Sequence, residues 1–359
     1  MTTNILKKIE VFGQLGRIIR DFYDKETAGI SHKNALYDKI KKGIIKTEAE
    51  NPWFTQDFQL INLKAWGEIL NEYKLKEWLS FYPEMEKNNY KEKKVGLILA
   101  GNIPLVGFHD ILCVLMSGHF ALTKLSSKDR LMYPLLKDII SDIDQETGNK
   151  WIILEEEKLS GIDAIIATGS DNSARYFDYY FGKYPNIIRK NRNSVAVLSG
   201  NETDKDIKAL GDDIFLYFGL GCRSVSKIYV PEDFGPEQFY PYIEQYASIY
   251  RHTKYANNYD YQKAVHLVNK VPIFDNGFLI LKKDKSLSSP VGCLYYERYK
   301  DLNVVNDELG RQFDKIQCVV SGIHEIPKRI QFGKSQFPEL YEYADNLDTL
   351  KFLFNLYEK

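Results

Sequence analysis

The chain has 359 residues, of which 44% are hydrophobic and 27% charged, and its formal net charge at pH 7 is −1. A disordered chain needs low hydrophobicity and high net charge, so this composition indicates a globular protein, long enough for two domains. A net charge this close to zero excludes a general electrostatic attraction to nucleic acid or to an anionic membrane.

Three kinds of feature are not expected. The N-terminal stretch MTTNILKKIEVFG lacks the uninterrupted apolar core of a signal peptide. The most apolar region, residues 95–125, is interrupted by Asn102, His109 and Asp110, which argues against a transmembrane helix. The 4 Cys are too far apart for a disulfide framework, and the 6 His never stand at metal-ligand spacing. We therefore expect a cytoplasmic protein with no metal site and no membrane span.

Residues 1–93 predict a helical N-terminal region. Near the N-terminus, apolar residues recur on one face of a 3.6-residue period. They are Ile5, Ile9, Phe12, Leu15, Ile19 and Phe22. A second helical stretch follows NPWFTQDF, with Thr55 as its expected N-cap, and LKEWLSFY (residues 75–82) continues the pattern. We expect this region to pack on the domain that follows.

From residue 94 onward, short apolar strands alternate with helical segments. The predicted strands are VGLILAG (95–101), HFALTKL (119–125), WIILEE (151–156) and AIIATGS (164–170). Between the first two strands we expect a helix that ends at Gly118. Strands that are almost entirely apolar and separated by helices indicate a parallel sheet covered on both faces. We assign residues 94–193 to this domain.

A second α/β domain is predicted over residues 194–325. Its strands are SVAVLSG (194–200), SKIYVP (226–231), FLILKKD, VGCLYYERYKD and IQCVVSG, and a long helical region reaches to about Lys270. The polar and aromatic tail, residues 326–359, is predicted to be an arm that packs on another element or subunit.

Polar residues follow the carboxyl ends of three predicted strands of the first domain, which is where parallel sheets bind ligands. They are Asn102, Lys124, Ser126, Ser127, Lys128, Thr168, Gly169 and Ser170. A Gly-Ser turn that opens a helix offers N–H groups and a positive dipole end to a phosphate. The G-x-G-x-x-G fingerprint is absent, so a standard dinucleotide-binding loop is not expected.

Cys222 is the candidate nucleophile of the second domain. It stands in FGLGCRSVSKIYVP, where Gly219 and Gly221 reduce the bulk around the sulfur. Arg223 and Lys227 would favour the thiolate if they point toward it. The other cysteines, Cys113, Cys293 and Cys318, lie within apolar runs and read as small core residues.

Taken in order, these segments resemble the aldehyde dehydrogenase superfamily, and most closely its acyl-CoA reductase branch, typified by the fatty-acid reductase component of bacterial luminescence systems. GNIPLVGFHDILCVLMSGHFALTKLSSKD resembles the family's N-x-P stretch leading into K-P-S-E, and ATGS resembles F-T-G-S. GLGCRSVSKIYVP resembles the segment that carries the catalytic Cys. SPVGCLYYERYKD is similar to the F-G-P-V region, and IQFGKSQFPELYEYADNLDTLKF to the C-terminal F-G-G-x-K-x-S-G segment. The similarity runs from about residue 94 to the C-terminus.

The resemblance implies a role for each candidate. Cys222 would be the nucleophile, and Asn102 an oxyanion-hole donor beside the Cys222 backbone N–H. Lys124 would bind the adenosine ribose, and Gly169 and Ser170 would line the cofactor's pyrophosphate. Together the implied cofactor-binding residues are Lys124, Ser126, Ser127, Lys128, Thr168, Gly169 and Ser170.

Three departures from the family pattern bear on the direction of the expected reaction and on its cofactor. Hydrolytic members carry a Glu general base in E-L-G-G, but the equivalent stretch here, residues 188–197, contains no carboxylate. Its absence favours reduction, because the acyl-enzyme must survive until hydride arrives. The Glu of K-P-S-E aligns with Ser127, and Lys128 follows; losing a carboxylate and gaining a cation suits the 2′-phosphate of NADPH. The Glu that positions the nicotinamide ribose in relatives is replaced by LSSPVG, residues 287–292.

We therefore predict an aldehyde-dehydrogenase-like α/β fold: a helical N-terminal region, a parallel-sheet cofactor domain and a second α/β catalytic domain. The predicted activity is NADPH-dependent reduction of a fatty acyl thioester, from CoA or a carrier protein, to the aldehyde. An oxidative aldehyde dehydrogenase and a non-catalytic acyl-carrying subunit are the alternatives. An acyl-protein synthetase is a candidate partner, and we expect a homo-oligomer. The acyl chain length and the acyl donor are not readable from the sequence.

Overall fold

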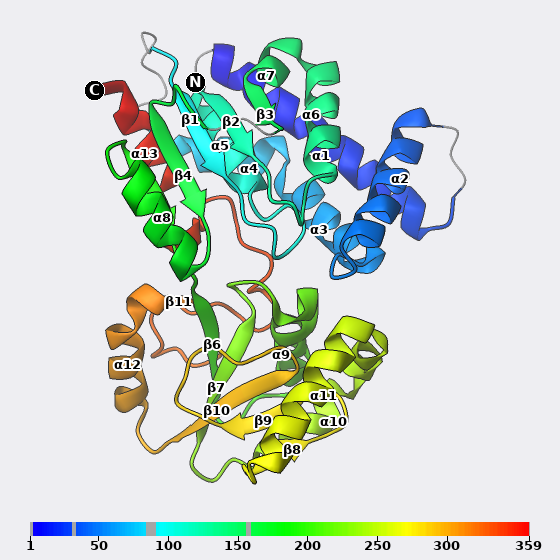
Figure 1. Cartoon of the computed structure of the whole chain (residues 1–359), viewed down its shortest axis with the longest axis vertical. Coiled ribbons are helices and arrows are strands. Elements are labelled where there is room, and N and C mark those ends of the chain that lie inside the picture. Colours follow the sequence, from blue (N-terminus) through cyan, green and yellow to red (C-terminus); the bar gives the residue numbers. More distant parts are fainter. Residues whose placement is uncertain (1–2, 31–33, 84–90, 156–158, 359) are drawn as a thin grey trace. The chain divides into compact units, whose positions relative to one another are not determined.

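The chain folds into two compact units in the computed structural model, which describes residues 3–30, 34–83, 91–155 and 159–358. Unit 1 comprises Met1–Lys190 and Glu339–Lys359, and unit 2 comprises Asn191–Pro338 (Figure 1). Residues 326–338, the first part of the tail, thus belong to unit 2, and the remainder of the tail returns to unit 1. No helix within the described ranges combines the length and the apolar character needed to cross a membrane.

Unit 1 is built around a parallel sheet with strand order β3-β2-β1-β4-β5. The strands are β1 (Lys94–Ile98), β2 (Phe120–Lys124), β3 (Trp151–Leu154), β4 (Ala164–Thr168) and β5 (Asn186–Arg189). The chain runs outward from β1 to β3 and then returns to place β4 on the other side of β1. The strand order therefore reverses between β1 and β4, and ligands of open parallel sheets bind at such a reversal.

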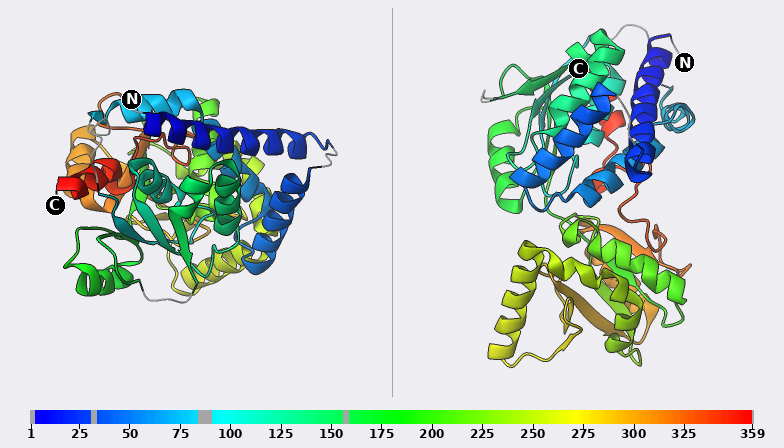
Figure 2. Two further views of the ribbon diagram at one scale, coloured as in Figure 1. Left: turned by 90° about the horizontal axis from the view of Figure 1, so that it is seen from above. Right: turned by 90° about the vertical axis from the view of Figure 1, so that its right-hand side faces the viewer.

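Nine helices of unit 1 have bounds within the described residues. They are α1 (Thr3–Thr27), α2 (Ala35–Glu50), α3 (Gln56–Ile69), α4 (Glu72–Ser80), α5 (Phe108–Ser117), α6 (Met132–Ile143), α7 (Gln145–Asn149), α8 (Asp171–Phe181) and α13 (Thr349–Asn355). All of the apolar residues predicted to form the face of the first helix are buried in α1, which packs against α3, α4 and α6 (Figure 2). Thr55 caps α3 as predicted, since its side chain accepts a hydrogen bond from the N–H of Phe58.

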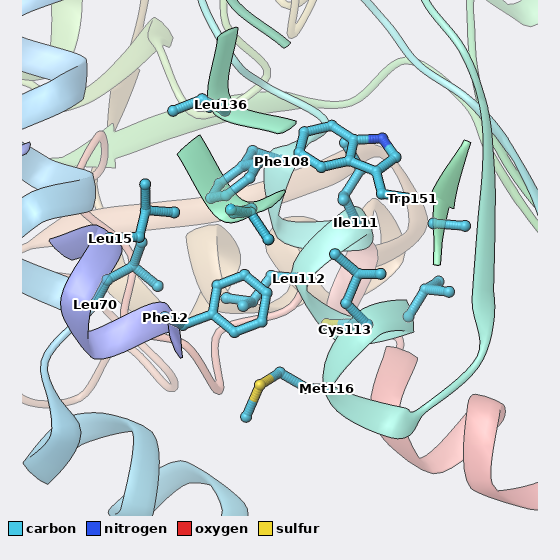
Figure 3. Close-up of a cluster of buried hydrophobic side chains, with 14 of the residues drawn as sticks. Phe12, Leu15, Leu70, Phe108, Ile111, Leu112, Cys113, Met116, Leu136 and Trp151 are labelled. Carbon is cyan, nitrogen blue, oxygen red and sulfur yellow. The ribbon is translucent and has the colours of Figure 1, made fainter. Parts of the chain in front are cut away.

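One face of the unit 1 sheet is the larger core. Val95 and Leu97 of β1 point into it together with α1, α5 and α6. Figure 3 shows part of this cluster, in which Phe108, Leu112 and Trp151 are buried between the helices and the sheet. The opposite face is covered by α8, whose Phe177 and Phe181 pack on a smaller cluster of strand residues. Helices thus lie on both faces, as the apolar strands predicted.

Unit 2 contains a second sheet, with order β11-β6-β7-β10-β9-β8, that is parallel except for the antiparallel pair β8 and β9. The strands are β6 (Asn193–Val197), β7 (Val225–Pro231), β8 (Ile273–Asp275), β9 (Ile280–Lys283), β10 (Cys293–Tyr299) and β11 (Ile316–Ser321). The helices are α9 (Asp204–Phe215), α10 (Tyr240–Ile243), α11 (Thr253–Val268) and α12 (Leu302–Arg311).

The two faces of the unit 2 sheet pack on different helices. Ala196 of β6 faces α9 and α10, whereas its neighbours Val195 and Val197 face α12, as the alternation of strand side chains requires. Figure 1 shows α9 and α12 on opposite sides of this sheet. The predicted fold class, an aldehyde-dehydrogenase-like α/β architecture with two sheets, is confirmed by this arrangement and by its similarity to solved structures, described below.

Candidate functional site

The unit 1 candidates gather at the carboxyl edge of its sheet. Ile98, the last residue of β1, pairs with Lys124 of β2 on one side and with Ala167 of β4 on the other. The segments that carry the candidates therefore leave from neighbouring strand ends at the reversal of strand order. Asn102, Lys124, Ser127, Lys128 and Ser170 are exposed there. Ser126, Thr168 and Gly169 are half-buried.

The loop after β1 packs tightly on the turn after β2. A Cβ at Gly101 would lie 2.4 Å from Ser126 Oγ, so only glycine allows this approach. The carboxylate of Asp129 accepts the N–H of Leu105 at 2.7 Å, and the Tyr133 hydroxyl accepts the N–H of Gly107 at 3.1 Å. These bonds fix the loop that carries Asn102 to the turn that carries Ser126, Ser127 and Lys128.

Asp129 is the buried titratable group at this junction. Its side chain is almost inaccessible, and burial raises its pKa to about 7, although the Leu105 N–H opposes the shift. Its Oδ1 has no hydrogen-bond partner among the described protein atoms. A buried carboxyl group with one unpaired oxygen is costly when ionised, so the proton is retained toward neutral pH.

The turn after β4 opens α8 directly. The Ser170 side chain caps this helix by accepting the N–H of Ser173 at 3.2 Å. Gly169 donates its N–H to the carbonyl of Arg189 at 3.3 Å, and a Cβ there would come within 2.7 Å of the Ser173 Cβ. The predicted Thr-Gly-Ser turn is thus a close helix entry, whose N-terminal dipole favours an anion such as a phosphate.

Cys222 lies in unit 2, in the turn between the short 3₁₀ segment η2 (Leu216–Gly219) and β7. Tyr217 and Phe218 have φ values of 55° and 57°, and Gly219 follows at 71°. Three successive residues in the left-handed region form a sharp bend, which for bulky residues is held only by the surrounding structure. The bend brings Cys222 to a half-exposed position.

The other three cysteines are buried, as the sequence predicted. Burial raises the pKa of Cys113 well above its usual value, that of Cys293 to about 12 and that of Cys318 to about 11. These thiols therefore stay protonated at neutral pH and serve as small core side chains. Cys222 is the one cysteine of the four that is not buried.

Polar groups surround the Cys222 turn. Ser194 of β6 donates its hydroxyl to the carbonyl of Cys222 at 2.9 Å. The Arg223 guanidinium donates to the carbonyl of Ser335 at 3.3 Å, and its charge partly opposes the rise that burial causes in the pKa of Cys318. Arg223 thus contributes positive charge to the cluster that contains Cys222.

Lys227, the other predicted cation, is turned to a different partner. Its buried ammonium group donates to the carboxylate of Glu297 at 2.6 Å and to the carbonyl of Lys285 at 2.8 Å. The structure therefore assigns Lys227 to an ion pair within the sheet, where its charge is balanced.

Asp213 of α9 and Gln336 are polar residues of this region that no sequence pattern singles out. Both are buried close to the Cys222 turn, through contacts described below. The end of α9 lies between Asp213 and Cys222, and more than 100 residues lie between Cys222 and Gln336. No local spacing pattern in the sequence therefore connects either residue to Cys222. Within the residues that the structure describes, no group of three or more His, Cys, Asp or Glu side chains is arranged to hold a metal.

The candidates thus form two sets. The eight residues at the carboxyl edge of the first sheet all belong to unit 1, and Cys222 belongs to unit 2. The first set has the glycines, the helix N-terminus and the lysines that an anionic nucleotide needs; the second has a reachable thiol with a cation beside it.

A family model described as acyl-CoA reductase (LuxC) matches residues 67–244, a span that contains every candidate from Asn102 to Cys222. Over this span the chain is similar to the acyl-CoA reductases. Over 224 residues it is 24% identical to the long-chain acyl-protein thioester reductase 2 of Photobacterium leiognathi, covering 58% of this chain and 46% of that protein. Over 231 residues it is 26% identical to the long-chain acyl-protein thioester reductase of Aliivibrio fischeri, covering 59% and 47%. The chain therefore matches these reductases over about half of their length.

Solved aldehyde dehydrogenases share the fold of this chain. Aldehyde dehydrogenase 21 from Physcomitrella patens superposes with a TM-score of 0.68 at 11% identity, covering 98% of this chain and 84% of that one. Betaine aldehyde dehydrogenase from Staphylococcus aureus, solved with NAD+, gives a TM-score of 0.57 at 12% identity over 88% and 72%. Glyceraldehyde-3-phosphate dehydrogenase GapN from Methanocaldococcus jannaschii, complexed with NADP, gives 0.54 at 15% identity over 99% and 92%.

Proposed function

We propose that this chain reduces a fatty acyl thioester to the aldehyde, with Cys222 as the residue that takes up the acyl group and NADPH as the hydride donor. The observation that carries the proposal is the half-exposed position of Cys222 in a sharp, glycine-flanked turn, while the other three cysteines are buried. Only a reachable thiol can attack a substrate carbonyl, and Arg223 beside it supplies charge that favours the thiolate.

The acyl-transfer step uses the residues of the chain alone. The Cys222 thiolate attacks the thioester carbonyl, a new C–S bond forms, and the bond to the donor thiol breaks, releasing that thiol as thiolate. One thioester replaces another, so the step is close to balanced. The side-chain amide of Asn102 and the backbone N–H of Cys222 are proposed to donate to the carbonyl oxygen as negative charge develops on it.

The carboxyl edge of the unit 1 sheet fits a nicotinamide dinucleotide. The reversal of strand order is where open parallel sheets bind ligands, and the α8 N-terminus after Gly169 supplies positive potential for a pyrophosphate. Lys124 would hold the adenosine ribose, and Lys128 the 2′-phosphate. When bound, the cofactor would supply a hydride to the acyl carbon, and the Cys222 sulfur would be the thiolate leaving group as the aldehyde forms.

The acyl donor belongs to the same proposal. The matched reductases are named for long-chain acyl-protein thioesters, so we propose a fatty acyl group carried by a protein or by CoA as the substrate. An acyl-protein synthetase is the corresponding candidate partner. The stretch 188–197 presents Ser194, not a carboxylate, to the Cys222 turn, and this favours reduction of the acyl-enzyme over its hydrolysis.

Acyl labelling tests this function directly. The full chain is incubated with acyl-CoAs of several lengths, first without cofactor to measure covalent acylation, then with NADPH to measure aldehyde and the loss of absorbance. We expect acylation and turnover in the parent and in Cys293→Ala, which alters a buried cysteine of the same unit, and neither in Cys222→Ala. Undiminished acylation of Cys222→Ala would refute the assignment, and free acid in place of aldehyde would indicate an oxidative or hydrolytic enzyme.

A further inference from the structure

A buried carboxylate lies beneath the Cys222 turn. Asp213, near the end of α9, is completely buried, and burial raises its pKa to about 6. One of its oxygens accepts the N–H of Gly333 at 2.7 Å and the other accepts the N–H of Ser335 at 2.9 Å. Both donors belong to residues 333–336, which we call the clasp segment. The carboxylate therefore fastens a segment 120 residues farther along the chain to α9.

The clasp segment reaches the residues on either side of the nucleophile. The carbonyl of Ser335 accepts the Arg223 guanidinium at 3.3 Å. The side-chain amide of Gln336 donates to Ser224 Oγ at 3.1 Å, and the same oxygen accepts the N–H of Gly221 at 3.2 Å. Gly221 and Arg223, the immediate neighbours of Cys222, and Ser224, the next residue, are thus tied directly or through one bond to the segment that Asp213 holds.

The backbone of the clasp segment is shaped for this attachment. Gly333 has φ of +75°, in the left-handed region that favours glycine. A Cβ at this position would lie 3.1 Å from the Ala209 Cβ on α9, tighter than ordinary contact. The segment therefore approaches the helix closely enough for Asp213 to accept two of its N–H groups.

We propose that Asp213 is a positioning residue for Cys222, which acts by holding the clasp segment and, through it, Arg223 and Ser224 after the thiol and Gly221 before it. The proposal rests on the proposed function, because it concerns the geometry of the same nucleophile. Charge-assisted hydrogen bonds to backbone N–H groups are stronger than neutral ones, so a buried carboxylate suits this role.

A second role for a carboxylate near a thioester would be to activate water. Asp213 is ill-placed for it, since its side chain is fully buried and both oxygens already accept backbone hydrogen bonds. A general base must reach the proton that it removes, directly or through one water. The two roles predict different results for Asp213→Asn. A positioning role predicts slower alkylation of Cys222, whereas a general-base role predicts unchanged alkylation and slower hydrolysis of an acylated Cys222.

The test measures the reactivity of Cys222 itself. The full-length parent, Asp213→Asn and Asp212→Asn are alkylated with iodoacetamide between pH 6 and 9, and modification of Cys222 is followed by peptide mass spectrometry. Asp212→Asn is the matched control, since this neighbouring carboxylate accepts the Tyr246 hydroxyl at 2.7 Å, whereas the N–H groups of Gly333 and Ser335 donate to Asp213. We expect Asp213→Asn to slow alkylation about tenfold at neutral pH and to move the profile to higher pH, as Arg223 loses its anchor.

Equal profiles for Asp213→Asn and Asp212→Asn would overturn the proposal. So would unchanged alkylation combined with slower hydrolysis of an acylated Cys222, which would identify Asp213 as a base. If Asp213→Asn does not fold, Gln336→Ala takes its place, because it removes the bond to Ser224 without leaving a buried charge, and it must slow alkylation in the same direction. Alkylation requires no substrate, so failure of the proposed reductase activity would show in the acylation assay and leave this readout intact.

Discussion

The hydroxyl of Ser194 donates a hydrogen bond to the backbone carbonyl of Cys222 at 2.9 Å. The same oxygen accepts the N–H of Cys318 at 3.2 Å and lies 2.9 Å from the Cys318 sulfur. Because the hydroxyl hydrogen is committed to Cys222, the Cys318 thiol is the donor in the last contact. Ser194 thus joins β6, β11 and the Cys222 turn, within a stretch, residues 188–197, that contains no carboxylate.

Removal of this hydroxyl should slow acyl transfer. Ser194→Ala leaves the Cys222 carbonyl and the Cys318 N–H without their buried partner, which typically costs about 1–3 kcal/mol of stability. We expect a cooperative fold, a lower melting temperature and acylation of Cys222 slowed about tenfold. Ser321→Ala is the control, because its hydroxyl donates to the Val197 carbonyl at 2.7 Å between the same strands. Comparable acylation rates in the two variants would contradict this role of Ser194.

Asn102 is proposed as an oxyanion donor, and its loss should affect rate more than cofactor binding. Removing one such donor typically lowers kcat by about 10²–10³. We expect a fall of this size in Asn102→Ala and at least as large a fall in Asn102→Asp, which keeps the size but replaces the amide donor with an acceptor. The NADPH dissociation constant, measured by fluorescence titration, should stay within about twofold of the parent's. Parent-like turnover in either variant would remove Asn102 from the mechanism.

Much of the unit 1 fold follows from local patterns. The periodic face of α1, the cap at Thr55, the strand β4 and the left-handed Gly118 after α5 (φ 91°) are all where the sequence predicts them. The strand predicted over residues 151–156 is found as β3 (Trp151–Leu154), and residue 156 of that prediction lies outside the described residues. Long amphipathic or apolar runs can be recognised in the sequence because burial of one face is the dominant interaction of the helices and strands that they form.

The strand β5 (Asn186–Arg189) was not predicted, and its last residue shows why. Arg189 is buried, a position that its charge argues against. It is tolerated because its guanidinium pairs with Asp110 of α5 and donates to the Thr349 hydroxyl of α13 at 3.0 Å. Those partners lie 79 and 160 residues away, so no local pattern in the sequence can reveal them.

The same limit applies to the candidate site. The resemblance and the strand ends selected the residues at the sheet edge and Cys222, because glycine turns and strand termini are local features. The role of Asp213 depends on two backbone N–H groups of the clasp segment, a contact that only the folded chain contains. Hydrogen bonds to backbone groups place little demand on the partner's side chain, so they leave no sequence signature.

Lys128 is proposed to select NADPH, and charge reversal should invert that preference. Its backbone is fixed by two contacts, from its N–H to Ser126 Oγ at 3.3 Å and from the Asn51 side chain to its carbonyl at 3.1 Å, while the side chain is exposed. We expect Lys128→Glu to weaken NADPH binding about tenfold through repulsion of the 2′-phosphate, with little change for NADH. Lys91→Glu makes the same charge change before the amino end of β1 and should leave both affinities alone. A constant ratio of the two dissociation constants across these variants would refute the selection.

Asp129 should make the stability of the chain depend on pH in a defined direction. Its pKa is about 7 in the folded chain and near 3.8 when the carboxyl is not perturbed. Between these values the folded state binds more protons than the unfolded state, so this group's contribution falls as pH rises from about 4 to 7 and stays low above that. A shift of this size corresponds to an upper limit of about 4 kcal/mol.

Asp129→Asn removes the titration while keeping the shape and the carbonyl that accepts the Leu105 N–H. The variant's amide adds a constant cost, but the penalty of an ionised buried carboxylate disappears, so the variant gains relative to the parent as pH rises. We expect the difference in melting temperature, variant minus parent, to be more positive at pH 8 than at pH 5 by about 2 °C or more. Asp213, with a pKa of about 6, titrates in the same pH range. Because it is present in both the variant and the parent, its contribution cancels from the difference in melting temperature. Asp138→Asn, which alters an exposed carboxylate of α6 paired with Lys39, should show a difference that hardly changes with pH. If Asp129→Asn behaved like Asp138→Asn, the carboxyl of Asp129 would have to be ionised and well solvated in the folded chain.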